Sequence, residues 1–424
     1  MAEVDVIVER AEPAIREQGT ADILIAVPTF NNENTIGAVL NAARTALLQF
    51  PQRKALIAHL DGGSTDSTVQ RAKDSLQGAA CFAQVSYPVY PIHRLEVSHH
   101  SVPGKDSAYR TIFFMAQELD VKACCIVGGD AILTPDWIAS LVQPILELGF
   151  DLAAPSYQGP KYDGLLVKTA LYPLLRALFG KGLKQPIGSD FGYSPRLIRH
   201  CLQESWNNEA ARRDVDLWID VQAVQNDMKL CQVYLGFRPR SVKEGGQDVS
   251  SILSNLVGAV YLEMERTAEL WQRVRGSNPI PSVGLRFDPE TDEQVIDVKP
   301  MIQAFRIGFA HLQDIWALAL PPATVLELKR LSRQPEDQFR FPAELWARIV
   351  YDFAVAHRLR LIGRDHLLRT LTPLYMGCIA SVILNMLGSN NSQNEDEIER
   401  ICLAYEAQKP YLISRWRWPD RFMP

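Results

Sequence analysis

The sequence has few of the features that mark nucleic-acid-binding, disulfide-rich or zinc-binding proteins. Lysine and arginine (44) are fewer than aspartate and glutamate (49), the net charge is −5, and the pI is near 6.0. The basic stripe that neutralises nucleic-acid phosphates is therefore missing, and we expect no nucleic-acid partner. The seven cysteines are odd in number and lack C-x-x-C spacing. We expect neither a disulfide framework nor a structural zinc site.

A targeting segment and a long apolar run are also missing. The first residues are acidic and mixed, without a basic region followed by an apolar one, so we expect no secretory signal and a cytoplasmic protein. The most apolar stretch, 371–387, contains Pro373 and Asn385 and is shorter than the ~20 apolar residues that cross a bilayer. We expect a buried helix there and no membrane span.

Three short apolar runs predict buried strands of an α/β fold. They span 23–27, 55–60 and 123–127, and segments with helical spacing of apolar residues occur at 35–50 and 108–119. Apolar runs without alternation are typical of parallel strands that are covered on both faces. A polar loop follows each run. Since ligands of open α/β sheets bind at the carboxyl edge, the three loops together predict one site.

The pattern changes after about residue 246. Long amphipathic segments at 249–274 and 301–318 predict helices. Residues 151–192 are rich in Gly, Pro, Tyr and Lys and predict a functional loop, such as an acceptor wall. We expect three parts, which are an N-terminal extension over 1–20, an α/β domain over 21–248 and a helical domain over 249–424.

Acidic side chains in the first two polar loops have two interpretations. Asp61 and Asp66 flank a Gly-Gly-Ser-Thr turn. There they could accept hydrogen bonds from a nucleoside or close an Asx turn before a helix. Glu33 is equally ambiguous, because an acid in the first turn of a helix is stabilising by itself. The sequence leaves both interpretations open.

Lys105 and Asp130 are the candidates for binding a diphosphate. Lys105 lies in the segment VPGKDS before a predicted helix, whose first N–H groups favour anions. Asp130 follows the third apolar run and could ligate Mg²⁺ or Mn²⁺ on a diphosphate. It could instead cap the turn before a helix, for which Thr134 is a good N-cap with Pro135 at the first helical position.

Considered together, the motifs resemble the family 2-like glycosyltransferases of the GT-A fold over roughly residues 20 to 245. PTFNNENTIG is similar to their P-x-x-N-E segment, LDGGSTDST to D-D-G-S-T-D, PGKDSA to G-K-G-x-A, and GGDAILTPDWI to the D-x-D region. The resemblance implies a Rossmann-like nucleotide-sugar-binding domain, followed here by a helical domain. It implies donor contacts by Pro28, Phe30, Glu33, Asp61, Gly104, Lys105, Gly129, Asp130 and Gly188.

A finer resemblance is to the retaining branch that makes mannosylglycerate and glucosyl-3-phosphoglycerate. The segment QPIGSD at 185–190 is similar to its Q-P-L-G-G-E, and WID at 218–220 to its W-G-I-D. The resemblance implies transfer of a hexose from a GDP- or UDP-linked donor to a small hydroxy acid such as glycerate or 3-phosphoglycerate. It also implies catalytic roles for Lys105, Asp190 and Asp220.

The sequence departs from the family at the metal site. Gly128 stands where the first aspartate of D-x-D is expected, and the metal-binding histidine expected before Gly245 is missing. Asp130 with Glu244 remains the expected pair of ligands for Mg²⁺ or Mn²⁺, because Mg²⁺ often needs only one or two carboxylates plus substrate phosphates. Asp248 is another candidate ligand. Lys243 could instead supply the positive charge.

The departures keep two alternative functions open. One is a nucleotide-sugar-binding protein without turnover, and the other is an inverting transferase with a lipid or cell-wall acceptor. Cations that could hold an acceptor carboxylate are Lys161, Lys184 and Arg196. The pair His99-His100 predicts a surface loop, since adjacent residues cannot face one metal from a helix or strand. The oligomeric state stays open, with a homo-oligomer among the states considered.

Overall fold

The computed structural model describes residues 3–77, 79, 81–89, 102–131, 134–206, 209–237, 248–286 and 296–419. His99, His100, Lys243 and Glu244 lie outside this set, so the expectations for them have no structural counterpart. The chain forms two compact units. The sheet unit comprises Met1–Gln158, Gln185–Gly246 and Ile280–Phe287, and the helical unit comprises Gly159–Lys184, Gln247–Pro279 and Asp288–Pro424.

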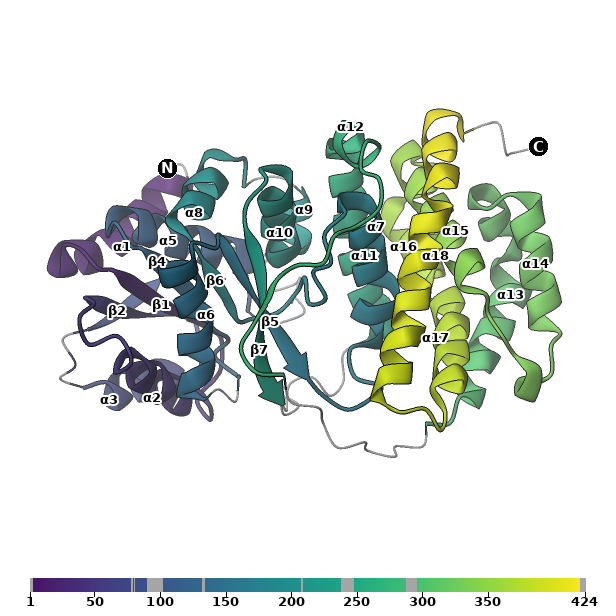
Figure 1. The fold of residues 1–424 in the computed structure, drawn as a ribbon. Coiled ribbons are helices and arrows are strands. Elements are labelled where there is room, and N and C mark those ends of the chain that lie inside the picture. Colours follow the sequence, from purple (N-terminus) through teal and green to yellow (C-terminus); the bar gives the residue numbers. More distant parts are fainter. Residues whose placement is uncertain are drawn as a thin grey trace. The chain divides into compact units, whose positions relative to one another are not determined.

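The described strands of the sheet unit form one eight-stranded sheet in the order β3-β2-β1-β4-β6-β5-β7-β8 (Figure 1). The strands are β1 Ile23–Thr29, β2 Ala55–Asp61, β3 Phe82–Ser86, β4 Ala123–Ile126, β5 Leu152–Gln158, β6 Phe191–Tyr193, β7 Leu230–Phe237 and β8 Ser282–Val283. The three predicted strands are confirmed as β1, β2 and β4. β1 pairs in parallel with both β2 and β4, so their carboxyl ends meet at one edge.

β6 was not predicted, and it makes the sheet mixed. It runs antiparallel to both β4 and β5. β5 therefore points the same way as β4, and Asp151, which precedes β5, lies at the amino edge of the sheet. The β6 residue Gly192 is required where β6 passes α6, because a Cβ there would lie 2.4 Å from the carbonyl oxygen of Leu141.

The helices of the sheet unit pack in two groups. They are α1 Glu3–Gln18, α2 Ile36–Leu47, α3 Thr68–Ser75, α5 Lys105–Glu118, α6 Pro135–Leu148, α8 Pro195–Gln203, α9 Glu209–Arg213 and α10 Val215–Gln225. α2 contacts α3 and α6, whereas α5 contacts α1, α8 and α10. The apolar residues of β1 are fully buried, and those at 23, 25 and 27 pack in one core with α2 and α6.

α6 shows how the local sequence sets a helix boundary. Thr134 is its N-cap with extended backbone, Pro135 follows at the first position, and Gly149 ends the helix in the left-handed region. The predicted cap position is confirmed, although the Thr134 hydroxyl makes no capping hydrogen bond.

The helical unit confirms the expected helical C-terminal region. Its elements are the π-helix η1 Val167–Leu171, α7 Tyr172–Phe179, α11 Val249–Arg266, α12 Ala268–Trp271, α13 Lys299–Ala319, α14 Pro322–Ser332, the 3₁₀ helix η3 Glu336–Gln338, α15 Ala343–Leu359, α16 Arg364–Thr370, α17 Thr372–Met386 and α18 Asn391–Arg417. α13 packs on α17, and α18 packs on α7 and α15. Residues 159–184, expected within the α/β domain, cluster with these helices.

One helical stretch in the described part of the chain, Arg364–Met386, is long and apolar enough to cross a membrane. Its most apolar window is 72% buried inside the structure, as in the core helix of a globular unit. α17, which occupies most of this stretch, is the buried helix predicted for 371–387.

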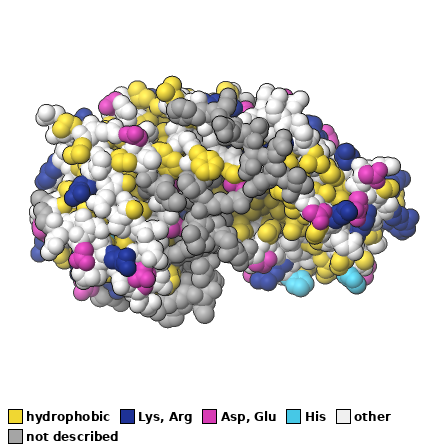
Figure 2. Space-filling model, turned by 90° about the horizontal axis from the view of Figure 1, so that it is seen from below, with side chains coloured by type: hydrophobic (Ala, Val, Ile, Leu, Met, Phe, Trp, Pro, Cys, Tyr) yellow, Lys and Arg dark blue, Asp and Glu magenta, His cyan; other side chains and the backbone are white. Residues whose placement is uncertain are grey.

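On the face drawn in Figure 2, Lys and Arg side chains lie beside Asp and Glu side chains at several places.

Candidate active site

The loops that follow β1 and β2 are joined by backbone-to-side-chain hydrogen bonds. The N–H of Asn31 donates to Ser64 Oγ (2.9 Å), and the N–H of Glu33 donates to Asp66 Oδ2 (3.2 Å). In the reverse direction, the N–H of Ser67 donates to Glu33 Oε2 (3.2 Å). Glu33 and Asp66 thus accept hydrogen bonds from the backbone of the two loops. This agrees with the interpretation in which they stabilise the local backbone.

Asp61 closes the turn after β2, which is the first of its two interpretations to have structural support. Its Oδ2 accepts the N–H groups of Gly63 (2.9 Å) and Ser64 (3.0 Å), closing the turn after β2. Its Oδ1 is buried and has no hydrogen-bond partner among the described residues. One carboxylate oxygen therefore holds the loop, while the ligand contact predicted for Asp61 stays a prediction.

Tyr87 explains the glycine that follows Asp61. A Cβ on Gly62 would lie 2.3 Å from the Tyr87 hydroxyl. That hydroxyl donates to the carbonyl oxygen of Pro103 (2.9 Å), in the loop before α5. The turn after β2 and the start of α5 are thereby fixed to one another. The sequence analysis did not single out Tyr87, and no motif marks it.

Lys105 is the first residue of α5 and follows Gly104, whose φ of 62° is in the left-handed region that favours glycine. The Lys105 ammonium forms a short salt bridge with Asp216 and donates to the Gly188 carbonyl oxygen (3.1 Å). An ammonium has three donors, and these two contacts engage two of them among the described residues. Lys105 thus joins α5 to α10 and to the loop before β6.

The loop after β4 packs closely against the end of β1. A Cβ on Gly129 would lie 2.5 Å from Thr29 Cγ2 and 3.2 Å from the Pro28 carbonyl oxygen. The hydroxyl of Thr35 donates to the Gly129 carbonyl oxygen (2.6 Å). Because Gly129 allows this close approach, Asp130 is brought beside the first polar loop.

Asp190 is fully buried and holds this loop from the other side. Its Oδ1 accepts the Gly128 N–H (3.0 Å), and its Oδ2 accepts the Tyr157 hydroxyl at short distance. Both carboxylate oxygens are therefore engaged within the protein. The catalytic role predicted for Asp190 stays a prediction, while its contacts make it an anchor between β5, β6 and the loop after β4.

Asp220 belongs to a buried acidic group at the start of α10. Burial, and then the charges of Asp216 and Asp214, raise the pKa of Asp220 well above its usual value. Burial and the Asp216 charge also raise the pKa of Asp214 to about 6. Asp214 caps α10 by accepting the Leu217 N–H (3.0 Å). The protonated form of Asp220 is favoured, and its predicted role toward sugar hydroxyls stays a prediction.

Asp216 is the main residue that sequence reasoning missed. It is buried and forms the salt bridge with Lys105. The signal was the segment DVDLWID, in which three aspartates alternate with large apolar residues. Carboxylates are almost never fully buried unless they are paired, so such a segment predicts a buried cation nearby.

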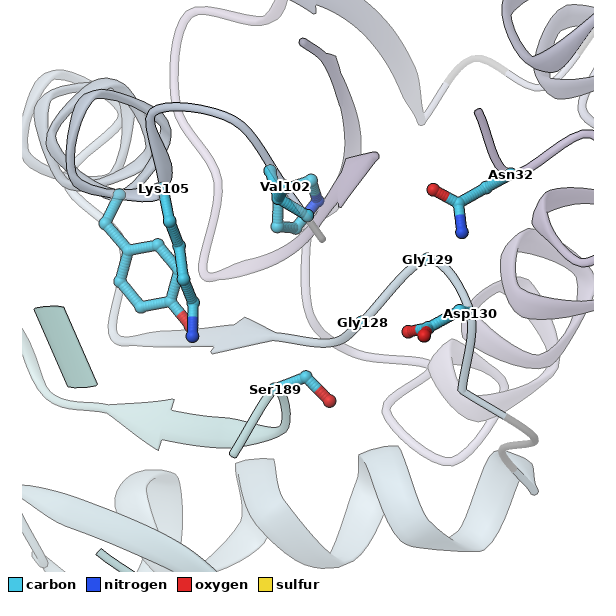
Figure 3. A pocket seen from close by; sticks show the side chains of 9 residues that line it. Asn32, Val102, Lys105, Gly128, Gly129, Asp130 and Ser189 are labelled. Carbon is cyan, nitrogen blue, oxygen red and sulfur yellow. The ribbon is translucent and has the colours of Figure 1, made fainter. Parts of the chain in front are cut away.

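A cavity at the carboxyl edge brings several of these residues together (Figure 3). Of the predicted donor contacts, Pro28, Lys105, Gly129 and Asp130 line it. The lining also includes Asn32, Val102, Tyr109, Gly128 and Ser189. The other predicted residues in the described part of the chain do not line this cavity, and these are Phe30, Glu33, Asp61, Gly104, Gly188, Asp190 and Asp220.

The cations proposed for the acceptor are engaged elsewhere or lie in other parts of the fold. Arg196 forms a salt bridge with Asp151 (3.2 Å), at the amino edge of the sheet and so opposite to the cavity. Arg196 is therefore not a ligand of this cavity. Lys161 donates to the carbonyl oxygen of Ser389 (3.0 Å) within the helical unit, and Lys184 belongs to that unit.

The expected metal site is tested by the oxygen atoms in the cavity. No cluster of three or more His, Cys, Asp or Glu that could hold a metal occurs among the described residues. Asp248 accepts the N–H groups of Ser250 and Ser251 as the N-cap of α11. In the cavity, Asp130 offers a carboxylate beside the Ser189 hydroxyl. The Asp130 carboxylate fits a Mg²⁺ or Mn²⁺ ion that takes most of its ligands from a diphosphate and water.

One family model and several solved structures are similar to parts of this chain. Residues 24–200 match the model described as Glycosyl transferase family 2. No curated protein matches. Among solved structures, the chain is similar to glucosyl-3-phosphoglycerate synthase from Mycobacterium tuberculosis in complex with Mn²⁺, UDP and glucosyl-3-phosphoglycerate. The identity is 20% over 60% of this chain and 82% of that chain, with a TM-score of 0.43.

Two further structures of that synthase give similar values. The complex with Mn²⁺, UDP-glucose and glycerol 3-phosphate is 20% identical over 60% of this chain and 82% of that chain, with a TM-score of 0.43. Another crystal structure of the M. tuberculosis enzyme is 19% identical over 61% and 84%, with a TM-score of 0.42. The family match spans β1, β2, β4 and the loops that form the cavity. Residues 24–200 are therefore similar to glycosyl transferase family 2, and this match indicates a glycosyltransferase.

Proposed function

We propose that the protein transfers a hexose from a GDP- or UDP-linked sugar to a small hydroxy acid such as glycerate or 3-phosphoglycerate. The observation that carries this proposal is the meeting of Lys105, Asp130 and Ser189 in one cavity at the carboxyl edge of the sheet. Ligands of open α/β sheets bind at this edge. We further propose that the enzyme works in the cytoplasm.

The diphosphate of the donor is assigned to this cavity. α5 begins at Lys105, and the first N–H groups of a helix together with its dipole favour negative charge. The remaining donor of the Lys105 ammonium adds a charged hydrogen bond. The nucleoside is assigned to the neighbouring loop, where Asp61 Oδ1 is buried without a partner among the described residues.

Asp130 would hold a divalent cation, with Glu244 proposed as a second ligand. Such an ion neutralises the charge that develops on the leaving diphosphate. Stabilisation of developing charge by preorganised groups is usually the largest catalytic term. Asp130, Lys105 and the N-terminus of α5 are held in place by Gly129, Asp216 and Gly104 respectively.

Retention is favoured by the position of the carboxylates. An inverting transferase needs a general base within hydrogen-bond reach of the acceptor hydroxyl. Among the described residues that line the cavity, Asp130 supplies the carboxylate, and this group is assigned to the cation. Asp190 has both oxygens engaged. The small-acid acceptor is supported by the resemblance of the segment QPIGSD to the retaining branch, since this segment contributes Ser189 to the cavity.

A second candidate function is a binding protein without turnover. The observation that favours it is Gly128, which removes one carboxylate from the expected metal site. Such a protein would bind the nucleotide sugar through the same loops. It would release no nucleoside diphosphate at a rate above that of the uncatalysed reaction.

The experiment that tests the proposal follows release of the nucleoside diphosphate by the purified full chain. Donors are UDP- and GDP-linked glucose and mannose, and acceptors are glycerate and 3-phosphoglycerate, each with Mg²⁺, Mn²⁺ or chelator. We expect release with one donor only when an acceptor is present, and an α-linked product from an α-linked donor by NMR. Binding of the nucleotide sugar in calorimetry without any release would favour the second candidate.

Asp130→Asn tests the role of Asp130 in the same assay. Asn and Asp are about equal as helix and turn caps, so a purely structural Asp130 would tolerate the change. If Asp130 holds the cation, turnover falls at least roughly a hundredfold, as for the loss of other groups that stabilise developing charge. Mg²⁺ should also tighten binding of the nucleoside diphosphate by the parent and not by the variant.

A further inference from the structure

Position 128 has no room for a side chain. A Cβ there would lie 2.8 Å from both Cβ and Oγ of Ser189 and 3.2 Å from Asp130 Oδ1. Gly128 N–H is bound to Asp190, so the backbone at 128 is fixed. The space beside Asp130 is therefore occupied by the side chain of Ser189, which reaches it from the loop before β6.

The Ser189 hydroxyl is buried and lacks a hydrogen-bond partner in the part of the chain that the structure describes. Ser189 is 6% exposed, and its Oγ has no hydrogen-bond partner among the described residues. Both Ser189 and Asp130 line the cavity, and Figure 3 shows the hydroxyl on the Asp130 side of the loop. A buried hydroxyl without a partner costs free energy and is rare in native structures. Its retention at this place indicates a ligand.

We propose that the Ser189 hydroxyl donates a hydrogen bond to a diphosphate oxygen of the donor, a contact that rests on the function proposed above. A nucleoside diphosphate offers anionic acceptors, and a hydroxyl can donate to them directly. A carboxylate at position 128 could not do so without a cation, because it would repel the diphosphate. Ser189 beside Gly128 thus gives part of the diphosphate affinity without metal.

The residues on both sides of Ser189 are anchored, which holds its Cα and Cβ in place beside the cavity. The Gly188 carbonyl oxygen accepts from the Lys105 ammonium (3.1 Å). Asp190 accepts from Gly128 and from Tyr157. Binding therefore needs no ordering of this loop, and a preorganised donor of this kind retains more of its hydrogen-bond energy.

The test compares Ser189→Ala with Ser194→Ala. Ser194 is also 6% exposed, but it donates to Asp151 (2.8 Å) and accepts the Leu197 N–H (3.1 Å) at the amino edge of the sheet. Affinity for UDP and GDP is measured by calorimetry with Mg²⁺ and with chelator. Thermal unfolding is measured without nucleotide.

We expect Ser189→Ala to weaken nucleoside diphosphate binding by roughly ten- to a hundredfold, the loss of one hydrogen bond to a charged group. The loss should be the same with Mg²⁺ and with chelator, and Tm should not fall. Ser194→Ala should lower Tm and leave the affinity unchanged. A Ser189→Ala variant with parental affinity, or with a loss seen only with Mg²⁺, overturns the proposal. If the parent itself binds neither nucleotide, the proposed function fails first.

Two variants test whether Ser189 excludes a side chain at position 128. They are Gly128→Asp alone and Gly128→Asp combined with Ser189→Gly. Gly128→Asp alone should lower Tm, because the new side chain meets Ser189. The double variant should recover Tm, and its nucleoside diphosphate affinity should depend on Mg²⁺ more strongly than that of the parent. A double variant no more stable than Gly128→Asp alone would show that Ser189 is not what excludes a side chain at 128.

Discussion

Each unit of the molecule contains a buried ion pair, and the two pairs differ in how completely they are satisfied. In the helical unit, Asp352 accepts from Arg415 Nε (2.7 Å), and both of its oxygens accept from the Tyr411 hydroxyl (2.8 and 2.9 Å). In the sheet unit, Lys105 pairs with Asp216 in the presence of two further buried aspartates, Asp214 and Asp220.

The surroundings of the sheet-unit pair contain more acid than base and several orphan atoms. Two of these orphan atoms are Asp220 Oδ2 and Ser189 Oγ, which are buried without hydrogen-bond partners among the described residues. The carboxylate of Asp352 has no such orphan oxygen. A completely satisfied network fixes a structure, whereas groups left unsatisfied near a cavity indicate a place where a ligand completes them. We therefore propose that the helical-unit pair contributes to stability and that the sheet-unit pair contributes to ligand binding.

The largest effect should come from breaking the pair in the helical unit. Arg415→Met removes the cation that is hydrogen-bonded to the buried Asp352, and loss of one partner of a buried pair costs about 3–5 kcal/mol. Urea unfolding of the full chain should show this loss, while turnover per folded molecule stays at the parental value. Adding Asp352→Asn should recover much of the stability. A single variant as stable as the parent would contradict a structural role for the pair.

The next effect concerns the orphan oxygen of Asp61. Replacement by alanine would also remove the acceptor of Gly63 and Ser64, so Asp61→Asn is the cleaner change. Its amide oxygen keeps those contacts and its NH₂ group replaces Oδ1. Loss of a hydrogen bond to a charged group should cost about 1.5–3 kcal/mol of nucleotide affinity in calorimetry. Unfolding without ligand should change little. Unchanged affinity would assign Asp61 to the turn alone.

Asp216→Asn should separate binding from turnover at the pair in the sheet unit. The neutral amide no longer compensates the Lys105 charge, so the diphosphate becomes the counter-ion and its affinity should rise by about tenfold, or ~1.4 kcal/mol. Turnover should fall, because Lys105 is no longer held and the product leaves more slowly. Asp214→Asn is the control, since it removes the same charge while keeping the α10 cap. Equal effects of both variants would show a general charge effect and no positioning by Asp216.

The sequence predicted the elements whose signal is local. β1, β2 and β4 are continuous apolar runs, and each polar loop after them lies at one edge because the strands are parallel. β6 has three residues, too few for a periodic pattern. Its antiparallel direction depends on pairing with strands distant in sequence, which no local pattern contains.

The site was predicted less completely, for a similar reason. Whether Glu33 and Asp66 bind a ligand or the loop depends on partners 33 and 34 residues away. Ser189 was missed as a ligand because its position beside Gly128 appears only once β4 and β6 pair. Asp216 was missed because its neighbours in α10 are apolar, so the segment is equally typical of a core helix.

The last prediction concerns the pH dependence of folding stability. It tests the excess of acid around the sheet-unit pair. The pKa of Asp220 is raised by burial and by the charges of Asp216 and Asp214. An unfolded aspartate loses its proton near pH 3.9, whereas the folded state keeps it, so stability falls as the pH rises above about 4. The pKa of Asp214 is raised to about 6. Asp214 therefore adds a further loss of folding stability as the pH rises, and this loss is complete near pH 6.

Asp220→Asn removes this titration and keeps the size of the side chain. The urea midpoint of the variant should exceed that of the parent at pH 8, and the difference should shrink toward zero near pH 4, where both forms are uncharged. Asp314→Asn, the same change at an exposed position of α13, should follow the parent at every pH. A constant difference between Asp220→Asn and the parent across this range would mean that Asp220 is not held in its protonated form. The acidic group would then resemble the satisfied pair of the helical unit.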